Sequence, residues 1–251
     1  MKILGCDYDG TLNWGGFDEA KLNAIQRWRN AGNKLGVVSG RGPAMMTTIQ
    51  KEFGLSLDFF VAFNGAVILD SKQKEIRKIA CTDVDLTKLV QDLFAWGCDF
   101  AHVNSDTYYL IQRDKTPLKE GACWLENLSL SPLLYQVSVV LENKERAAEI
   151  IVLIQENYGD FLTPLQNERC IDIVPKGVNK AEGMYQIMEF FHAKFEDILV
   201  VGDNLNDLDM IREFNSYAME NGIKEIKCIA KHITKSVTHL IEDELQTSSH
   251  F

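Results

Sequence analysis

The sequence lacks three features, and each absence removes a class of protein. None of its 251 residues belongs to a run of about 18 apolar residues, which a membrane-spanning helix needs. None of its six cysteines forms a CxxC pair, so we expect reduced thiols rather than a disulfide framework. Positive charge is also deficient: 26 Lys and Arg face 36 Asp and Glu, a net charge of −10, whereas nucleic-acid phosphates are bound by excess Lys and Arg. We therefore expect a cytoplasmic protein that binds neither membranes nor nucleic acid.

The composition is that of an ordinary globular protein, with 46% hydrophobic and 25% charged residues. A chain of this length can bury a sizeable core, either as one large domain or as two smaller ones. Net negative charge does not exclude a small phosphorylated ligand, because a few local cations can hold one. The oligomeric state cannot be read from the pattern.

The first part of the chain alternates between strand and helix patterns. A buried strand precedes Asp7, and a helix follows from 17 to 32, with Asp18 as its cap and Gly32 at its end. A second strand, a second helix that ends at Gly54, and a strand–turn–strand segment at 59–70 come next. This order predicts a parallel sheet covered by helices on both faces.

The middle of the chain has a different pattern, with helices at 83–95 and 144–157 around several alternating strand-like runs. It predicts a separate antiparallel sheet with two helices. The α/β order then returns with a helix after Asn179. Asn179 and Glu182 have the spacing of a capping box at the start of this helix. We therefore predict a core domain of 1–80 plus 176–251, interrupted by an inserted α+β domain of 81–175.

Four polar clusters follow predicted strands or begin a predicted helix. They are Asp7-Tyr8-Asp9-Gly10-Thr11, Ser39-Gly40-Arg41, Lys180, and the segment GDNLND at 202–207. Ligands of open parallel sheets bind beyond the carboxyl ends of the strands. Asp7 and Asp203 are therefore expected to converge on one hard cation. Mg²⁺ suits such a site, because it takes oxygen ligands and is usually held by one or two carboxylates plus substrate phosphate.

Each cluster has a plainer structural interpretation when taken alone. Asp-Gly and Ser-Gly are common turns, and Lys180 on a first helical turn is as readily a solvated side chain. A calcium-binding EF-hand loop starting at Asp7 would need a glycine where Leu12 stands, and a helix before it, and it has neither. Together, in this order and at these positions, the four clusters favour a functional site.

The segments DYDGTL (7–12), VVSGR (37–41), KGVNKAEG (176–183) and GDNLNDLDM (202–210) resemble the four motifs of the haloacid dehalogenase (HAD) superfamily. The insertion between the second and third motifs, together with FNGA at 63–66, is similar to the Cof-like type II phosphatase branch. The resemblance covers essentially the whole chain. It implies a Rossmann-like, doubly wound core with an inserted α+β cap, and a Mg²⁺-dependent phosphatase of small phosphorylated metabolites such as sugar phosphates.

The resemblance also implies a role for individual residues. Asp7 would be the nucleophile that becomes an aspartyl-phosphate, and Asp9 would be the general acid and base. The metal-binding set would be Asp7, the Asp9 backbone carbonyl, Asp203 and Asp207, with Asp207 orienting Lys180 or the metal's water molecules. The phosphate-binding set would be Thr11, Ser39, Gly40, Lys180 and Asn206. Asn221, in the segment MENG, matches one residue of a Gly-Asn-Ala segment common in the branch, and no contact is predicted for it.

Two other functions remain open at this point. A phosphomutase of the phosphomannomutase type shares the DxDGT motif and the aspartyl-phosphate, but its second motif runs Gly-Gly-Ser where this chain has Ser39-Gly40-Arg41. A receiver domain also carries a phosphorylatable Asp, acidic metal ligands and a Lys, but it is far shorter and has no large insertion. The hydrolase is therefore favoured.

The identity of the substrate is not encoded in these motifs. Specificity is expected in the 81–175 domain. The polar and aromatic candidates there are His102, Asn104, Tyr108, Tyr109 and Arg113, each of which has a structural or solvated interpretation as well.

Overall fold

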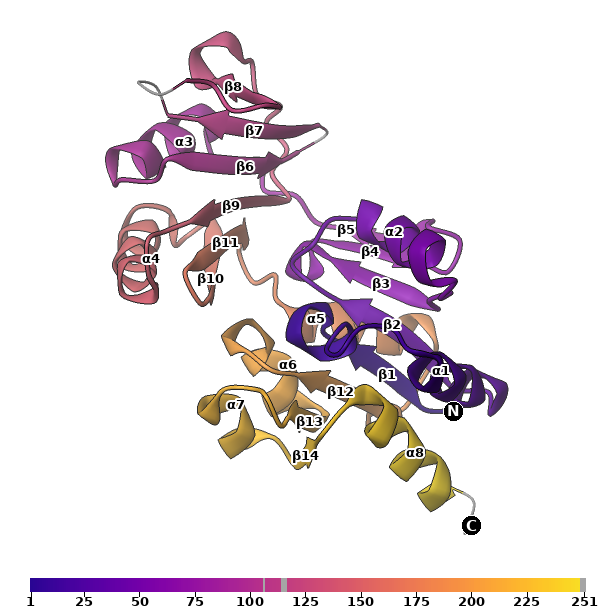
Figure 1. The fold of residues 1–251 in the computed structure, drawn as a ribbon. Coiled ribbons are helices and arrows are strands. Elements are labelled where there is room, and N and C mark those ends of the chain that lie inside the picture. The colour runs from indigo at the N-terminus through magenta and orange to yellow at the C-terminus, as the bar shows by residue number, and fades with distance from the viewer. Residues whose placement is uncertain (106, 114–116, 249–251) are drawn as a thin grey trace. The chain divides into compact units, whose positions relative to one another are not determined.

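The computed structural model describes residues 1–105, 107–113 and 117–248 (Figure 1). The chain forms two compact units. One comprises Met1–Lys78 and Asn179–Phe251, here called the core unit, and the other comprises Ile79–Val178, here called the inserted unit. The boundaries expected from the sequence differ from these by at most three residues.

An eight-stranded sheet forms the centre of the core unit, in the order β14-β13-β12-β1-β2-β3-β4-β5. Neighbouring strands from β14 to β3 are parallel, and β4 and β5 add an antiparallel edge. The strands are β1 (Ile3–Cys6), β2 (Lys34–Val38), β3 (Phe59–Ala62), β4 (Val67–Asp70), β5 (Glu75–Lys78), β12 (Ile198–Gly202), β13 (Asn215–Met219) and β14 (His232–Thr234). The predicted parallel-sheet core is confirmed.

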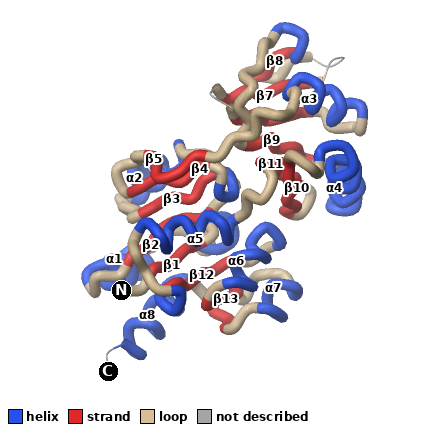
Figure 2. Tube along the Cα trace, turned by 180° about the vertical axis from the view of Figure 1, so that it is seen from behind, coloured by secondary structure: helices blue, strands red, loops and turns tan. Residues whose placement is uncertain are grey.

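Helices cover both faces of this sheet (Figures 1 and 2). They are α1 (Glu19–Asn30), α2 (Ala44–Phe53), α5 (Lys180–Phe190), α6 (Leu208–Glu213), α7 (Lys224–Ile229) and α8 (Val237–Ser248). Helices α5, α6 and α7 share one apolar cluster with the sheet, and α1, α2 and α8 cover the other face. Short helical turns span Tyr8–Leu12, Phe63–Gly65, Phe195–Asp197 and Leu205–Asp207.

The helix ends form where the sequence signals them. Asp18 caps α1 by accepting a hydrogen bond from the Lys21 amide at 2.8 Å. Gly54 ends α2 in the left-handed conformation, with φ of 64°. Asn179 caps α5 by accepting from the Glu182 amide at 2.9 Å, which is the Asn179 half of the expected capping box.

A glycine in β1 lets α5 approach the sheet closely. A Cβ atom on Gly5 would lie 2.6 Å from Sδ of Met184, which is fully buried on α5. The first residue of α5, Lys180, is also fully buried. The close approach of α5 to β1 therefore brings a lysine next to the carboxyl end of β1.

The inserted unit is an α+β layer of its own. Its six strands follow the order β10-β11-β9-β6-β7-β8, antiparallel except for the pair β7–β8. They are β6 (Phe100–Asn104), β7 (Tyr108–Gln112), β8 (Ala122–Trp124), β9 (Gln136–Val140), β10 (Leu162–Asn167) and β11 (Cys170–Pro175), with a helical turn at Leu125–Asn127. Helices α3 (Leu86–Ala95) and α4 (Lys144–Tyr158) pack on one face and bury a single apolar cluster with it.

The fold class expected from the sequence, an α/β parallel-sheet core with an inserted α+β unit, is thus observed. Among the residues that the structure describes, no helix is long and apolar enough to cross a membrane.

Candidate functional site

The site lies where two neighbouring parallel strands of the core unit end. Strand β12 pairs with β1 in parallel register, with Cys6 opposite Val201. The Asp7 amide continues this pairing by donating to the Val201 carbonyl at 2.9 Å. Asp7 and Asp203, which are 196 positions apart in the numbering, therefore leave the sheet side by side.

A buried ion-pair cluster stands at this edge. The ammonium group of Lys180 donates to Oδ1 of Asp7 at 2.6 Å and to Oδ1 of Asp207 at 2.5 Å. The side chains of Lys180 and Asp207 are fully buried, and that of Asp7 is 7% exposed. The predicted residues from the first, third and fourth motifs meet here.

Asp207 also shapes the loop that carries Asp203. Its second carboxylate oxygen, Oδ2, accepts from the Asp203 amide at 2.9 Å and from the Asn204 amide at 3.1 Å. A buried carboxylate with three charged or polar donors is well satisfied. Asp207 thus connects the lysine to the backbone of the Asp203 loop.

Asp203 joins the cluster from the other side. Its Oδ1 accepts a hydrogen bond of 2.8 Å from the Thr11 hydroxyl. One carboxylate oxygen from each of Asp7, Asp203 and Asp207 lies within 4.8 Å of the others. The cluster contains three carboxylates and one ammonium group, that of Lys180. Negative charge is therefore in excess at this largely buried site. Oxygen ligands with uncompensated negative charge fit a divalent cation such as Mg²⁺.

The pKa values of these carboxyl groups express the same charge imbalance. Burial raises the pKa of Asp7 well above its usual range, and the nearby Asp207 raises it further, together outweighing Lys180. Burial and the charge of Asp207 raise the pKa of Asp203 to about 6. For Lys180, burial lowers the pKa, but Asp207 and Asp7 overcome this effect and raise it. The lysine is therefore charged at every ordinary pH, and the carboxyl groups favour a bound cation or proton.

Asp9 lies outside this acidic cluster. Its two carboxylate oxygens accept from Nε of Arg41 at 2.7 Å and from Nη2 of Arg41 at 2.8 Å, a bidentate pair. Both side chains are about half exposed, and the guanidinium lies 5.5 Å from the centre of the Tyr8 ring. The hydrogen bonds that Arg41 donates to Asp9 raise the pKa of Arg41. The second motif contains Arg41 but predicts no role for it.

The remaining predicted phosphate-binding residues flank the cluster. Ser39 is buried just after β2, where its hydroxyl oxygen accepts from the Arg41 amide at 3.2 Å. Gly40 follows it and is partly exposed. Asn206 is partly buried in the turn Leu205–Asp207.

Three further residues near the site make contacts that the sequence does not predict. Lys21 is buried, and its ammonium donates to the carbonyls of Leu12, Trp14 and Gly16 at 2.8, 2.8 and 2.6 Å. Asn13 accepts from the Gly10 amide, and Asn221 donates to the Gly10 carbonyl, each at 3.0 Å. Sequence spacing holds no signal for these contacts, apart from the position of Asn221 in its motif.

The five candidates in the inserted unit separate into two groups. His102, Asn104 and Tyr108 belong to the sheet face opposite to α3 and α4, where Nδ1 of His102 lies 2.8 Å from the Tyr108 hydroxyl. Tyr109 packs partly against the apolar cluster. Arg113 donates to Asp99 at 2.5 Å and to the Phe94 carbonyl at 3.3 Å, which is a structural role.

The same open face carries a second polar group on adjacent strands. The Ser138 hydroxyl donates to Oδ1 of Asp172 at 2.7 Å, and Nε2 of Gln136 donates to the Ser138 oxygen at 2.9 Å. Burial lowers the pKa of His102, while Asp172 raises it. This face can therefore offer both donors and acceptors to a polar ligand.

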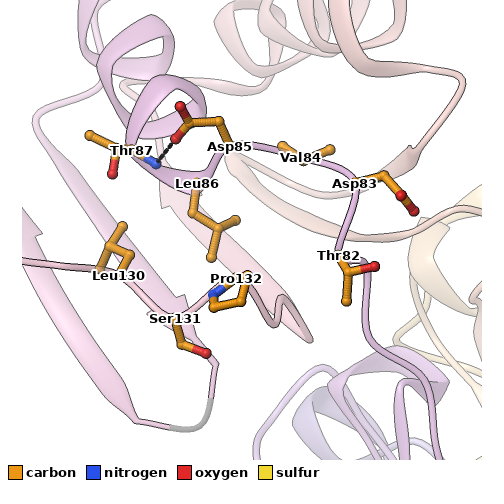
Figure 3. A pocket seen from close by; sticks show the side chains of 9 residues that line it. All are labelled: Thr82, Asp83, Val84, Asp85, Leu86, Thr87, Leu130, Ser131 and Pro132. Atoms are coloured by element: carbon orange, nitrogen blue, oxygen red, sulfur yellow. Dashed lines mark hydrogen bonds between the residues drawn. The ribbon is translucent and has the colours of Figure 1, made fainter.

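A pocket of about 360 Å³ lies elsewhere in the inserted unit, between the start of α3 and the segment 130–132 (Figure 3). It is lined by Thr82, Asp83, Val84, Asp85, Leu86, Thr87, Leu130, Ser131 and Pro132. Asp85 caps α3 by accepting from the amides of Thr87 and Lys88. The lining has two acidic and no basic side chains, so the pocket does not suit a phosphate group.

Comparison with known proteins agrees with the fold and the motifs. A family model described as haloacid dehalogenase-like hydrolase matches residues 4–239. The chain is 26% identical over 252 residues to the 5-amino-6-(5-phospho-D-ribitylamino)uracil phosphatase YitU of Bacillus subtilis, covering 92% of this chain and 91% of that protein.

Two solved structures share the fold at low sequence identity. SMU.1108c from Streptococcus mutans superposes with a TM-score of 0.83 at 20% identity, covering 98% of this chain and 99% of the other. The HAD subclass IIB sugar phosphatase BT4131 superposes with a TM-score of 0.78 at 17% identity, covering 99% of each chain. The family resemblance seen in the motifs is therefore confirmed: the chain belongs to the haloacid dehalogenase-like hydrolase family and is an enzyme of that family.

Proposed function

We propose that this hydrolase is a Mg²⁺-dependent phosphatase that cleaves small phosphorylated metabolites through an aspartyl-phosphate on Asp7. The observation that carries the proposal is the buried cluster at the ends of β1 and β12, in which Lys180 pairs with Asp7 and Asp207 while Asp203 stands beside them. A carboxylate nucleophile, a fixed cation and a divalent-metal site are the parts that phosphoryl transfer requires.

The cluster suits the first step, in which an oxygen of Asp7 bonds to phosphorus and the bond from phosphorus to the leaving oxygen breaks. Two anions must meet in this step, so their repulsion has to be neutralised. The Lys180 ammonium, 2.6 Å from Asp7 Oδ1, places one positive charge at the nucleophile. Negative charge gathers at this place in the transition state. Because the ammonium is buried, its charge stabilises that negative charge with little screening by water.

Asp7, Asp203 and Asp207 have the oxygen ligands and excess negative charge to bind Mg²⁺. The Asp9 backbone carbonyl completes the set that the family resemblance implies. A bound cation would supply further charge neutralisation at the transferring phosphoryl group. Asp207 already contacts Lys180 and the Asp203 loop, so it acts by holding both in place.

Asp9 would supply the proton chemistry in both steps. It would donate a proton to the leaving oxygen and then take one from the water that attacks the aspartyl-phosphate, releasing inorganic phosphate and free Asp7. A bound cation would keep the buried Asp7 ionised for its role as nucleophile, while Asp9, about half exposed and outside the acidic cluster, could carry and release a proton. Arg41, bidentate on Asp9, would set the orientation of that carboxylate.

Thr11, Ser39, Gly40 and Asn206 flank the cluster and would complete the binding of the phosphoryl oxygens. The inserted unit would act as the cap that selects the leaving group. YitU is named as a phosphatase of a phosphorylated ribitylamino compound, and BT4131 is named as a sugar phosphatase. Both substrates are rich in hydroxyl groups. The open sheet face with His102, Tyr108 and Asp172 has donors and acceptors suited to such a leaving group. We place this activity in the cytoplasm.

Phosphate release tests the proposal. The purified chain would be incubated with a panel of phosphorylated metabolites and an aryl phosphate, with Mg²⁺ or with a chelator. We expect Mg²⁺-dependent release that Asp7→Asn abolishes. Asp9→Asn should abolish turnover while leaving substrate binding largely intact.

The matched control is Asn157→Ala, an exposed side chain of α4 that should leave release unchanged. Release that persists in Asp7→Asn would contradict the nucleophile. Absence of release from every substrate, together with conversion of a sugar monophosphate into its positional isomer in the presence of a sugar bisphosphate activator, would show the mutase instead.

A further inference from the structure

The segment that carries Asp9 forms a tight turn whose shape bears on metal binding. Asp9 has φ of −77° and ψ of 119°, and Gly10 has φ of 80° and ψ of −6°. These angles are those of a type II turn over Tyr8–Thr11, whose ideal values are about −60° and 120° followed by 80° and 0°. Glycine at the third position permits this form without strain.

Type I and type II turns differ by a flip of the central peptide, here the peptide between Asp9 and Gly10. Because a peptide is planar, its N–H and C=O point in opposite directions, and holding one sets the other. Oδ1 of Asn13 accepts from the Gly10 amide at 3.0 Å. Asn13 therefore fixes the direction of the Asp9 carbonyl.

Asn221 holds the next peptide of the same turn. Its Nδ2 donates to the Gly10 carbonyl at 3.0 Å, although 211 positions separate the two residues. In the same loop, after β13, the Ile223 amide donates to the Asp203 carbonyl at 3.0 Å. The loop 220–223 thus connects the Gly10 turn to the Asp203 segment.

The two connected segments are in close contact, so one cannot shift toward the other without a steric clash. A Cβ atom on Gly10 would lie 2.5 Å from Oδ2 of Asp203. The Thr11 hydroxyl, next in the chain, donates to Oδ1 of the same carboxylate. A small change in the turn would therefore move one carboxylate of the acidic cluster as well as the Asp9 carbonyl.

We propose that Asn13 and Asn221 are positioning residues that lock the 8–11 turn in its type II form and hold it at the Asp203 loop, so that both segments can bind a divalent cation. The inference rests on the proposed function, because that function assigns the Asp9 carbonyl and Asp203 to the metal. Neither asparagine contacts the metal or the substrate in this role. Each acts through the backbone of Gly10.

Mn²⁺ binding measured by electron paramagnetic resonance, without substrate, tests the proposal independently of turnover. Loss of a group that orients a metal ligand weakens binding by about 10-fold or more. We expect this increase in Kd for both Asn13→Ala and Asn221→Ala. Asn157→Ala is the matched control, because it removes an exposed Nδ2 that donates to a backbone carbonyl at 2.8 Å and lies in the other unit.

A pair of charge-matched variants separates the two roles. Asn13→Asp keeps an acceptor for the Gly10 amide, whereas Asn221→Asp loses the donor to the Gly10 carbonyl and sets an oxygen against it. Each variant adds one negative charge, so charge alone predicts tighter binding of the cation in both. We expect Mn²⁺ to bind Asn13→Asp nearly as tightly as the unsubstituted protein, and Asn221→Asp at least several-fold more weakly.

The outcomes distinguish this inference from the proposed function. If the unsubstituted protein binds Mn²⁺ and Asp203→Asn weakens the binding, the metal site of the proposed function stands. Unchanged Kd values in Asn13→Ala and Asn221→Ala would then overturn the positioning roles alone. Absence of Mn²⁺ binding by the unsubstituted protein would overturn both. Circular dichroism of each variant would verify that it is folded.

Discussion

Lys180 and Asp207 form an ion pair from which water is excluded, with Nζ 2.5 Å from Oδ1 and neither side chain exposed. The same ammonium group contacts Asp7 at 2.6 Å. Removal of one partner from a buried ion pair destabilises the fold strongly, and more than the same removal from an exposed pair. The cluster therefore links stability of the metal-free protein to the chemistry of the site.

Replacement of this lysine should reveal that link. We expect Lys180→Met to lower the free energy of unfolding of the chelator-treated protein by about 3 kcal/mol or more, since it leaves Asp7 and Asp207 buried without their cation. Urea unfolding would measure the loss. Mg²⁺ should raise the Tm of the variant more than that of the unsubstituted protein, because the cation replaces the lost positive charge.

Lys194→Met is the control for the loss of a lysine, since its pair with Glu196 is largely exposed at 3.8 Å. It should change stability little. Equal losses in Lys194→Met and Lys180→Met would contradict the special role of the buried pair.

Metal affinity should depend on pH through Asp203. Burial and Asp207 raise the pKa of this carboxyl to about 6, so below that pH the site holds a proton that a cation must displace. We expect the apparent Mg²⁺ affinity to fall as the pH drops through 6. Isothermal titration calorimetry between pH 5 and pH 8, roughly spanning that value, would measure it. A flat profile would show that Asp203 does not compete for the metal.

Lys21 should stabilise the segment that follows the 8–11 turn. Its ammonium donates hydrogen bonds to three backbone carbonyls. One of these carbonyls belongs to Leu12, a fully buried residue. Lys21→Met keeps the apolar stem but leaves the carbonyls without their donor, which should lower the free energy of unfolding by about 1–3 kcal/mol. Limited proteolysis should cut 12–16 faster in the variant. Lys51→Met, at an exposed position of α2, should leave both measurements unchanged.

Protonation of His102 should weaken the inserted unit at low pH. Burial lowers the pKa of this imidazole, although Asp172 opposes the shift, so the unfolded chain binds the proton more tightly than the folded one. The sign follows: stability is complete above the unfolded pKa of about 6.5 and falls as the pH decreases below it. The loss of Tm between neutral and acidic pH should be smaller in His102→Asn. The same change at His239, which is exposed on α8, should not reduce the loss. An identical loss in His102→Asn would contradict this interpretation.

The elements that the sequence predicted well have local causes. Asp18, Gly54 and Asn179 act on backbone groups within a few residues of themselves, and all three lie at helix ends in the structure. The strand–helix alternation and the interruption at about 80 likewise depend on patterns within short windows. Asp7, Asp203 and Asp207 lie near one another because parallel strands share one carboxyl edge.

The sequence alone determined which residues of this hydrolase we propose for its chemistry, because carboxylates, a lysine and glycines stand at the ends of predicted strands or at the start of a helix. Only the tertiary structure decided that Lys180 is fully buried between Asp7 and Asp207, that Arg41 holds Asp9, and that Asn221 holds Gly10. Such contacts join segments up to 211 positions apart. They depend on the neighbours each strand acquires in the sheet and on how closely helices approach it, and no short window of sequence contains that information.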